Sequence, residues 1–177
     1  MANESISIRQ INEADKKWVT SFLEEHWGST RFVTRSRLFF ANENPGYIAV
    51  QDDRPIGLIT YEILGDECEI TTLTSLAERK GIGTDLINAV KDAAVQAACK
   101  RLLVITTNNN THAIRFYQRY GFIIAAVYPN SMEEARMIKL EIPLTGNDEI
   151  PLRDEIEFEI RLYKHKPATH KSEYVVL

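Results

Sequence analysis

Long hydrophobic runs are missing from this sequence of 177 residues, and cysteine is scarce. No stretch has the length and apolarity of a signal peptide or a membrane span, so we expect a cytoplasmic protein that makes no use of a membrane. Cys68 and Cys99 lack the spacing of metal ligands, and a structural disulfide between them is not expected. The sequence therefore predicts no metal cofactor and a reducing compartment.

An excess of positive charge is missing as well. The formal net charge is −4, which argues against general nucleic-acid binding. Hydrophobic residues make up 44% of the chain and charged residues 26%, as in ordinary soluble globular proteins. This length suits one well-cored domain. We expect residues 1–177 to form a single domain that ends in a loose tail over 165–177.

The hydrophobic pattern switches repeatedly between the strand period and the helix period. A strand at 5–9 precedes a helix at 13–25, which Asn12 caps, and three strands at 47–51, 56–64 and 68–76 form a meander. A helix to residue 98, a buried strand at 101–107, a helix at 111–120 and a strand at 122–128 follow. A half-exposed strand at 154–162 comes last. The expected order is β-α-α-β-β-β-α-β-α-β-β, which excludes a plain Rossmann alternation.

Two closely spaced glycines, Gly81 and Gly83, lie between the last strand of the meander and the next helix. Free backbone N–H groups and the positive end of a helix dipole make such a place suitable for an anion, above all phosphate. A nucleotide P-loop motif is absent, and Leu86 stands where a dinucleotide fingerprint needs a third small residue. A coenzyme A pyrophosphate remains, as does a turn without any ligand.

A second pattern lies one helix and one strand further on. Asn110, Ala113 and Tyr117 have the spacing i, i+3, i+7 and therefore share one face of a helix. Asn110 is placed to cap this helix or to reach a neighbouring amide, while Phe116 and Tyr117 can also be plain core aromatics. Either pattern alone has a purely structural reading, but both in this order are hard to obtain by chance.

Together the two patterns resemble the GNAT superfamily of N-acetyltransferases over roughly residues 6–162. Residues 79–84 are similar to its acyl-CoA pyrophosphate loop, and residues 110–122 to its Asn-x-x-Ala-x-x-x-Tyr-x-x-x-Gly-Phe segment. One position departs from the family, because Glu78 stands where Gln or Arg is usual. The resemblance implies the GNAT fold, an α+β fold with a central mixed, mostly antiparallel twisted sheet flanked by helices.

The resemblance further implies acetyl-CoA as co-substrate. Backbone N–H groups of residues 79–84 would hold its pyrophosphate, and an N–H near Leu73 would stabilise the developing oxyanion. Asn110 would bind the pantetheine arm, beside which the preceding strand ends. The residues expected at the cofactor are Leu73, Thr74, Ser75, Arg79, Lys80, Gly81, Ile82, Gly83, Thr84, Asn110, Ala113, Phe116 and Tyr117.

For the chemistry, the resemblance implies that Tyr117 protonates the departing thiolate as general acid. Glu69 is the expected general base, directly or through a water, because period-two alternation places it on the same strand face as Leu73. Glu67 on that face and Glu62 on the neighbouring strand are alternatives. Solvated strand carboxylates without a catalytic role are the structural alternative.

The expected function is transfer of an acetyl group to the primary amine of a small molecule, by direct attack in a ternary complex. A non-catalytic acyl-CoA sensor and an acetyltransferase for protein or peptide amines are the alternatives. Trp27, Arg31 and Tyr61 are the expected substrate residues, and the segment 142–155 is expected to close the pocket or a dimer edge. The sequence leaves a homodimer open and does not identify the acceptor.

Overall fold

The structure, a computed structural model, describes residues 6–77 and 80–162 and shows an α+β fold. The strands are β1 (Ser7–Gln10), β2 (Arg31–Thr34), β3 (Arg37–Phe40), β4 (Gly46–Gln51), β5 (Arg54–Leu64), β6 (Glu67–Ser75), β7 (Arg101–Thr107), β8 (Ile123–Tyr128) and β9 (Glu155–Arg161). The α-helices are α1 (Lys16–Trp27), α2 (Ile82–Gln96), α3 (Thr111–Tyr120) and α4 (Ser131–Ile138). Short 3-10 turns occupy Glu13–Asp15, Ala41–Glu43 and Asn147–Glu149.

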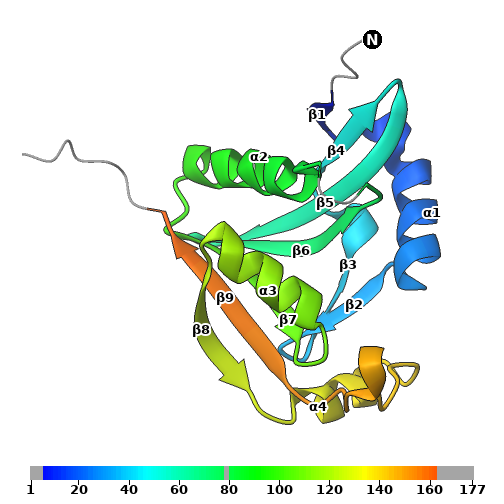
Figure 1. Ribbon diagram of the computed structural model, residues 1–177, viewed down its shortest axis with the longest axis vertical. Helices are drawn as coiled ribbons and strands as arrows, with labels where there is room; N and C mark the ends of the chain where they lie inside the picture. The colour runs from blue at the N-terminus through cyan, green and yellow to red at the C-terminus, as the bar shows by residue number, and fades with distance from the viewer. Residues whose placement is uncertain (1–5, 78–79, 163–177) are drawn as a thin grey trace, which may run out of the picture.

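Seven strands form one sheet in the order β1-β4-β5-β6-β7-β9-β8, and β2 and β3 form a separate hairpin. Neighbouring strands in the sheet are antiparallel except β6 and β7, which confirms a mixed, mostly antiparallel sheet. The parallel pairing of β6 with β7 stops at Ile70 and Val104. Beyond this point β6 continues to Ser75 and β7 to Thr107, and the two strands diverge (Figure 1). The sheet is therefore open between the last residues of β6 and the last residues of β7.

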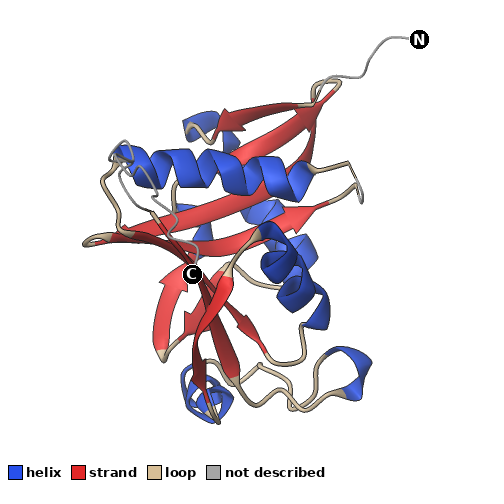
Figure 2. Ribbon diagram, turned by 60° about the vertical axis from the view of Figure 1, so that its left-hand side comes forward, coloured by secondary structure: helices blue, strands red, loops and turns tan. Residues whose placement is uncertain are grey.

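The two faces of the sheet carry different layers. Helices α2 and α3 lie on one face, where α2 buries an apolar stripe at helical spacing (Figures 1 and 2). The residues of this stripe are Ile82, Leu86, Ile87, Val90 and Ala94. Helix α1 covers the other face through a second hydrophobic cluster that includes Phe39 of β3. The β6–β7 opening is therefore bordered by α2 and α3 on one face of the sheet, and by α1 and the β2–β3 hairpin on the other face.

A β-bulge at Thr71 changes the alternation along β6. Thr72 pairs with Thr60 and Ile70 pairs with Tyr61, so Thr71 is an extra residue in the ladder. As a result Leu73 packs on the α2 side, whereas Glu69 bonds to the β2–β3 hairpin on the opposite side. The prediction that these two residues share one face is wrong, because strict period-two alternation assumes an uninterrupted strand.

Several predicted elements are confirmed, and two are not. Strand β7 and helix α3 have the predicted bounds, Asn12 caps the first helical turn, and Gly121 ends α3 in a left-handed conformation at φ 116°. The second N-terminal helix is wrong, since the β2–β3 hairpin occupies that part of the chain. Strand β9 is also not half-exposed, because Glu155, Glu157 and Glu159 are buried.

The predicted C-terminal tail, the two cysteines and the predicted lack of a membrane span are considered in turn against the described residues. The predicted loose tail at 165–177 lies outside the described residues. Cys68 and Cys99 are both free and buried. In the part of the chain that the structure describes, none of the helices has the length and apolarity to cross a membrane.

Candidate active site

The first turn of α2 has the geometry of an anion site. Gly81 is its N-cap residue in a left-handed conformation (φ 76°), and no described side chain caps this end. The first helical bond from this turn joins the Asp85 N–H to the Gly81 carbonyl at 3.0 Å. The N–H groups of Ile82, Gly83 and Thr84 precede it and therefore have no acceptor within the helix. They can therefore bind an anion such as phosphate.

Gly83 also determines how close α2 lies to α3. A Cβ atom at Gly83 would lie 3.0 Å from the ring atom Cζ of Phe116. Glycine therefore allows the Phe116 ring to pack against the first turn of α2. The structure thus brings together two of the predicted cofactor residues from helices that are far apart in the sequence.

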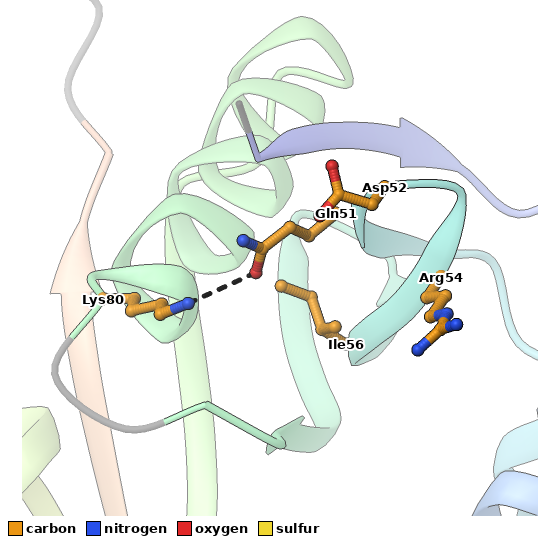
Figure 3. Close-up of a pocket in the computed structure, with 5 residues that line it drawn as sticks. All are labelled: Gln51, Asp52, Arg54, Ile56 and Lys80. Carbon is orange, nitrogen blue, oxygen red and sulfur yellow. Dashed lines mark hydrogen bonds between the residues drawn. The ribbon is translucent and has the colours of Figure 1, made fainter. Parts of the chain in front are cut away.

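The charged residues before Gly81 are only partly described. Glu78 and Arg79 lie outside the described residues. The Lys80 Nζ donates a hydrogen bond of 3.4 Å to Gln51 Oε1 on β4, across a hollow of about 480 Å³ (Figure 3). Its lining residues are Gln51, Asp52, Arg54, Ile56 and Lys80. The Lys80 ammonium therefore points toward the β4–β5 hairpin.

The end of β6 borders the opening in the sheet. From Thr71 to Ser75 the edge of β6 that faces β7 has no partner strand among the described residues. Leu73 is half-buried on the α2 side, while the Thr74 hydroxyl accepts a hydrogen bond of 2.8 Å from Trp27 Nε1 on the α1 side. An extended ligand can therefore pair with the free backbone groups here, as a further strand would.

Helix α3 presents the second predicted motif at the same opening. The Asn110 Oδ1 accepts the Ala113 N–H at 3.2 Å and so caps the helix. Tyr117 is 7% exposed, and its ring packs against Phe116 and Phe122 at centroid distances of 5.6 Å. Its hydroxyl makes no hydrogen bond to a described residue. Burial raises the pKa of Tyr117 above the ordinary 10.0, so the phenol stays protonated at neutral pH.

Glu69 lies on the other side of the sheet and is almost fully buried. Its carboxylate accepts hydrogen bonds from Thr34 Oγ1 at 3.2 Å and from the guanidinium groups of Arg35 at 2.9 Å and Arg37 at 3.2 Å. Arg37 also pairs with Glu62, which lies directly opposite Glu69 on β5. The β2–β3 hairpin therefore covers the predicted base and holds both of its oxygens.

Sequence reasoning missed a second group of carboxylates on this face. Arg101 on β7 donates to Glu67 at 2.7 Å, to Glu157 at 2.6 Å and to Glu159 at 2.9 Å. The Tyr128 hydroxyl donates to Glu157 at 2.6 Å. The regular alternation of glutamates with apolar residues in β9 was visible in the sequence. Which alternate residues meet solvent depends on distant segments, so the alternation alone could not reveal this burial.

A cavity of about 340 Å³ lies next to the end of β6. It is lined by Trp27, Gly28, Ser29, Lys139, Glu141, Ile142 and Pro143. Lys139 donates to the Arg31 carbonyl at 2.8 Å, and burial lowers the pKa of its ammonium group. The Arg31 side chain pairs with Glu141 at 3.6 Å. Of the predicted substrate residues, Trp27 therefore lines this cavity together with part of the predicted closing segment, and Arg31 contacts two of the lining residues.

Tyr61, the third predicted substrate residue, is not brought to this cavity. It lies in the hydrophobic cluster on the α2 face, where it is 8% exposed and stacks on Tyr47 at 6.2 Å. Burial raises its pKa to about 12. Within residues 6–77 and 80–162, no group of three or more His, Cys, Asp or Glu side chains is arranged to hold a metal ion.

Comparison with known proteins identifies the family of this chain. Residues 9–122 match the sequence profile of the Acetyltransferase (GNAT) family. The uncharacterized protein YdhI of Bacillus subtilis is 45% identical over 148 residues, which cover 83% of this chain and 92% of YdhI. The chain therefore belongs to the GNAT acetyltransferase family, and the resemblance found in the sequence is confirmed.

Solved structures share the fold. The IAA acetyltransferase from Bacillus cereus superposes with a TM-score of 0.67 at 22% identity, covering 89% of this chain and all of that one. A GNAT family acetyltransferase from Elizabethkingia anophelis, solved with acetyl-CoA bound, gives a TM-score of 0.63 at 19% identity and covers 90% of this chain and all of that one. These likenesses confirm the predicted GNAT fold.

Proposed function

We propose that this protein transfers the acetyl group of acetyl-CoA to the primary amine of a small molecule within a ternary complex. The observation that carries the proposal is the opening between β6 and β7. An uncapped helix start lies on one side of it, and a cavity lies on the other side, joined to β6 by the bond from Trp27 to Thr74. Two ligands that enter from opposite faces can therefore meet at the end of β6.

In this scheme acetyl-CoA occupies the face with α2 and α3. The N–H groups of Ile82, Gly83 and Thr84 bind the pyrophosphate, with further contacts from Gly81, Lys80 and Arg79. The pantetheine arm lies along the unpaired edge at Leu73, Thr74 and Ser75, between the two helices, where it passes Asn110, Ala113 and Phe116. This arrangement is supported by the free backbone groups at both places.

The chemistry follows from where the thioester would lie. The neutral amine attacks the carbonyl carbon, a C–N bond forms, and the oxyanion accepts a hydrogen bond from the N–H near Leu73. The C–S bond then breaks, and Tyr117 gives its proton to the sulfur. The proton that Tyr117 gives is replaced by one from the attacking nitrogen. Tyr117 suits this role because it remains protonated at every physiological pH.

The amine reaches the enzyme mostly as ammonium and must lose a further proton before attack. A carboxylate on the face opposite α2 is proposed to take it, directly or through a water. Glu69, the base predicted from the sequence, and Glu155 both lie on that face, buried beneath the β2–β3 hairpin.

The cavity at Trp27 is the proposed acceptor site. Its volume of about 340 Å³ suits a small molecule, and the lining combines the Trp27 indole with the Lys139 ammonium and the Glu141 carboxylate. Such a lining offers an apolar surface and a few polar groups that fix orientation.

The test is acetyl-CoA binding followed by turnover. Calorimetry should detect acetyl-CoA binding to the pure protein, and incubation with acetyl-CoA and a panel of small amines should release free thiol for at least one amine. An absence of acetyl-CoA binding would overturn the proposal. Binding without thiol release for any amine would point to a sensor, and thiol release only with peptides would point to a peptide acetyltransferase.

A further inference from the structure

The face of the sheet beneath the β2–β3 hairpin carries glutamates from three strands. They are Glu62, Glu67, Glu69, Glu155, Glu157 and Glu159. All but one of them pair with an arginine. Glu155 is the exception, because no described cationic group lies within 4.0 Å of its carboxylate. It is 2% exposed and accepts a hydrogen bond of 3.1 Å from the backbone N–H of Arg35. Burial of a carboxylate without a cationic partner is costly, so a structural role explains it poorly.

Glu155 is also placed at the opening between β6 and β7. It pairs in register with Thr107, the last residue of β7, beyond the point where the two strands separate. Glu69 lies just before that point on β6. Arg35 contacts both carboxylates, Glu69 through its guanidinium at 2.9 Å and Glu155 through its backbone N–H. Glu155 therefore lies on the acceptor side of the opening, one side chain away from the predicted base.

The turn that contacts Glu155 is strained. Arg35 and Ser36 both have left-handed backbone conformations, with φ of 47° and 58°. This conformation costs a residue other than glycine roughly 1–2 kcal/mol. It joins β2 to β3 through a tight turn, and it points the Arg35 N–H at Glu155.

The surroundings of Glu155 favour the protonated form of its carboxyl group. Burial raises its pKa, and the nearby Glu69 carboxylate raises it further. The Arg35 N–H and the Arg35 guanidinium act in the opposite direction, but the net pKa is raised. A carboxylate whose pKa lies closer to neutrality is the more effective general base. The Glu69 carboxylate, in contrast, accepts hydrogen bonds from two guanidinium groups.

We propose that Glu155 is the general base of the acetyl transfer and that Glu69 anchors the β2–β3 hairpin above it. This inference rests on the proposed function. The acceptor ammonium gives one proton to the Glu155 carboxylate, and the carboxyl group later returns that proton to solvent. The nitrogen loses its second proton to Tyr117, after Tyr117 has protonated the sulfur. One amide, one thiol and one released proton are formed for each acetyl group.

The test compares Glu155→Gln with Glu69→Gln across pH. A glutamine at 155 still accepts the Arg35 N–H but cannot take a proton, so this variant must use acceptor that is already neutral. For an acceptor with an ammonium pKa of about 9, roughly 1% is neutral at pH 7, so kcat/KM should fall about 100-fold there. The deficit should shrink about tenfold for each unit of rising pH until the pKa of the acceptor is reached. A second acceptor with a lower ammonium pKa should show a smaller deficit at pH 7.

Glu69→Gln serves as the matched control, since it removes a neighbouring buried carboxylate of the same size. Its deficit should stay constant with pH, because it weakens the ion pairs of the hairpin and leaves the proton acceptor in place. A pH-independent deficit in Glu155→Gln, or a pH-dependent one in Glu69→Gln, would overturn this inference while the proposed function stands. A wild-type protein that binds acetyl-CoA but releases no thiol with any amine overturns both.

Discussion

Replacement of Tyr117 by phenylalanine separates catalysis from stability. The substitution keeps the ring, which packs against Phe116 and Phe122 at 5.6 Å and against Phe158 at 6.1 Å. It removes a hydroxyl that makes no hydrogen bond to a described residue, so no such bond is lost. The free energy of unfolding of Tyr117→Phe should therefore stay within about 1 kcal/mol of the wild-type value.

Turnover by Tyr117→Phe, in contrast, should fall. General acid catalysis contributes about 10²–10⁴-fold, so we expect kcat to fall at least 100-fold. Acetyl-CoA affinity should change by less than about threefold, because the ring remains in place. The wild-type rate should also show no alkaline fall below pH 10 from this residue, since burial raises the pKa of Tyr117 above 10.0.

Steady-state thiol release, calorimetry with acetyl-CoA and urea unfolding measure these three quantities. Tyr120→Phe is the matched control, because Tyr120 lies on the same helix and its hydroxyl donates to Asn88 at 2.6 Å. The control should lose a little stability and keep its kcat. An unchanged kcat in Tyr117→Phe would refute the general-acid role. A loss of stability above 1 kcal/mol would refute the claim that the hydroxyl lacks a partner.

Two further substitutions test the layers on either side of the sheet. Arg101→Leu leaves buried Glu157 and Glu159 short of a cation, so the free energy of unfolding should fall by about 3–5 kcal/mol at pH 8, against under about 1 kcal/mol for the exposed Arg161→Leu. Burial raises the pKa of Glu159, but hydrogen bonds from Arg101 and Arg161 lower it overall, so its contribution is present above the ordinary carboxyl pKa and is lost as pH falls. Without Arg101 that pKa is higher, and the deficit in urea unfolding should shrink from pH 8 to pH 5, whereas a constant deficit would contradict this account. Gly83→Val forces a side chain against the Phe116 ring, which should cost about 1–3 kcal/mol and weaken acetyl-CoA binding at least tenfold in calorimetry. Unchanged affinity would show that the approach of α2 to α3 does not shape the cofactor site.

Much of the fold could be predicted because its signals are local. Gly81 and Gly121 both adopt left-handed conformations at the ends of α2 and α3, where the sequence places them. The bounds of β7 and α3 follow from a β-branched run and from the Asn110 cap. Each of these features depends on a few neighbouring residues, and the same neighbours make up the two motifs of the family.

The hairpin and α4 could not be predicted in this way. Strands β2 and β3 have four residues each, too few for a clear period, and their turn uses Arg35 and Ser36 at φ values that usually favour glycine or asparagine. Residues 131–138 gave no clear pattern, yet they form a helix. Short elements of this kind are stabilised by contacts with the rest of the protein more than by their own propensity.

The sequence by itself determined the family, the order of most strands and helices, and the residues that surround the proposed acetyl-CoA site. Only the tertiary structure decided which side of the sheet each carboxylate faces and whether solvent reaches it. The bulge at Thr71 moves Leu73 to the face opposite Glu69, and the hairpin buries Glu155 through a contact across 120 positions of the chain. Alternation along a strand is a local property, whereas the cover over each face comes from distant segments. Proton affinity depends on that cover, so the choice of a base could be made only in the folded protein.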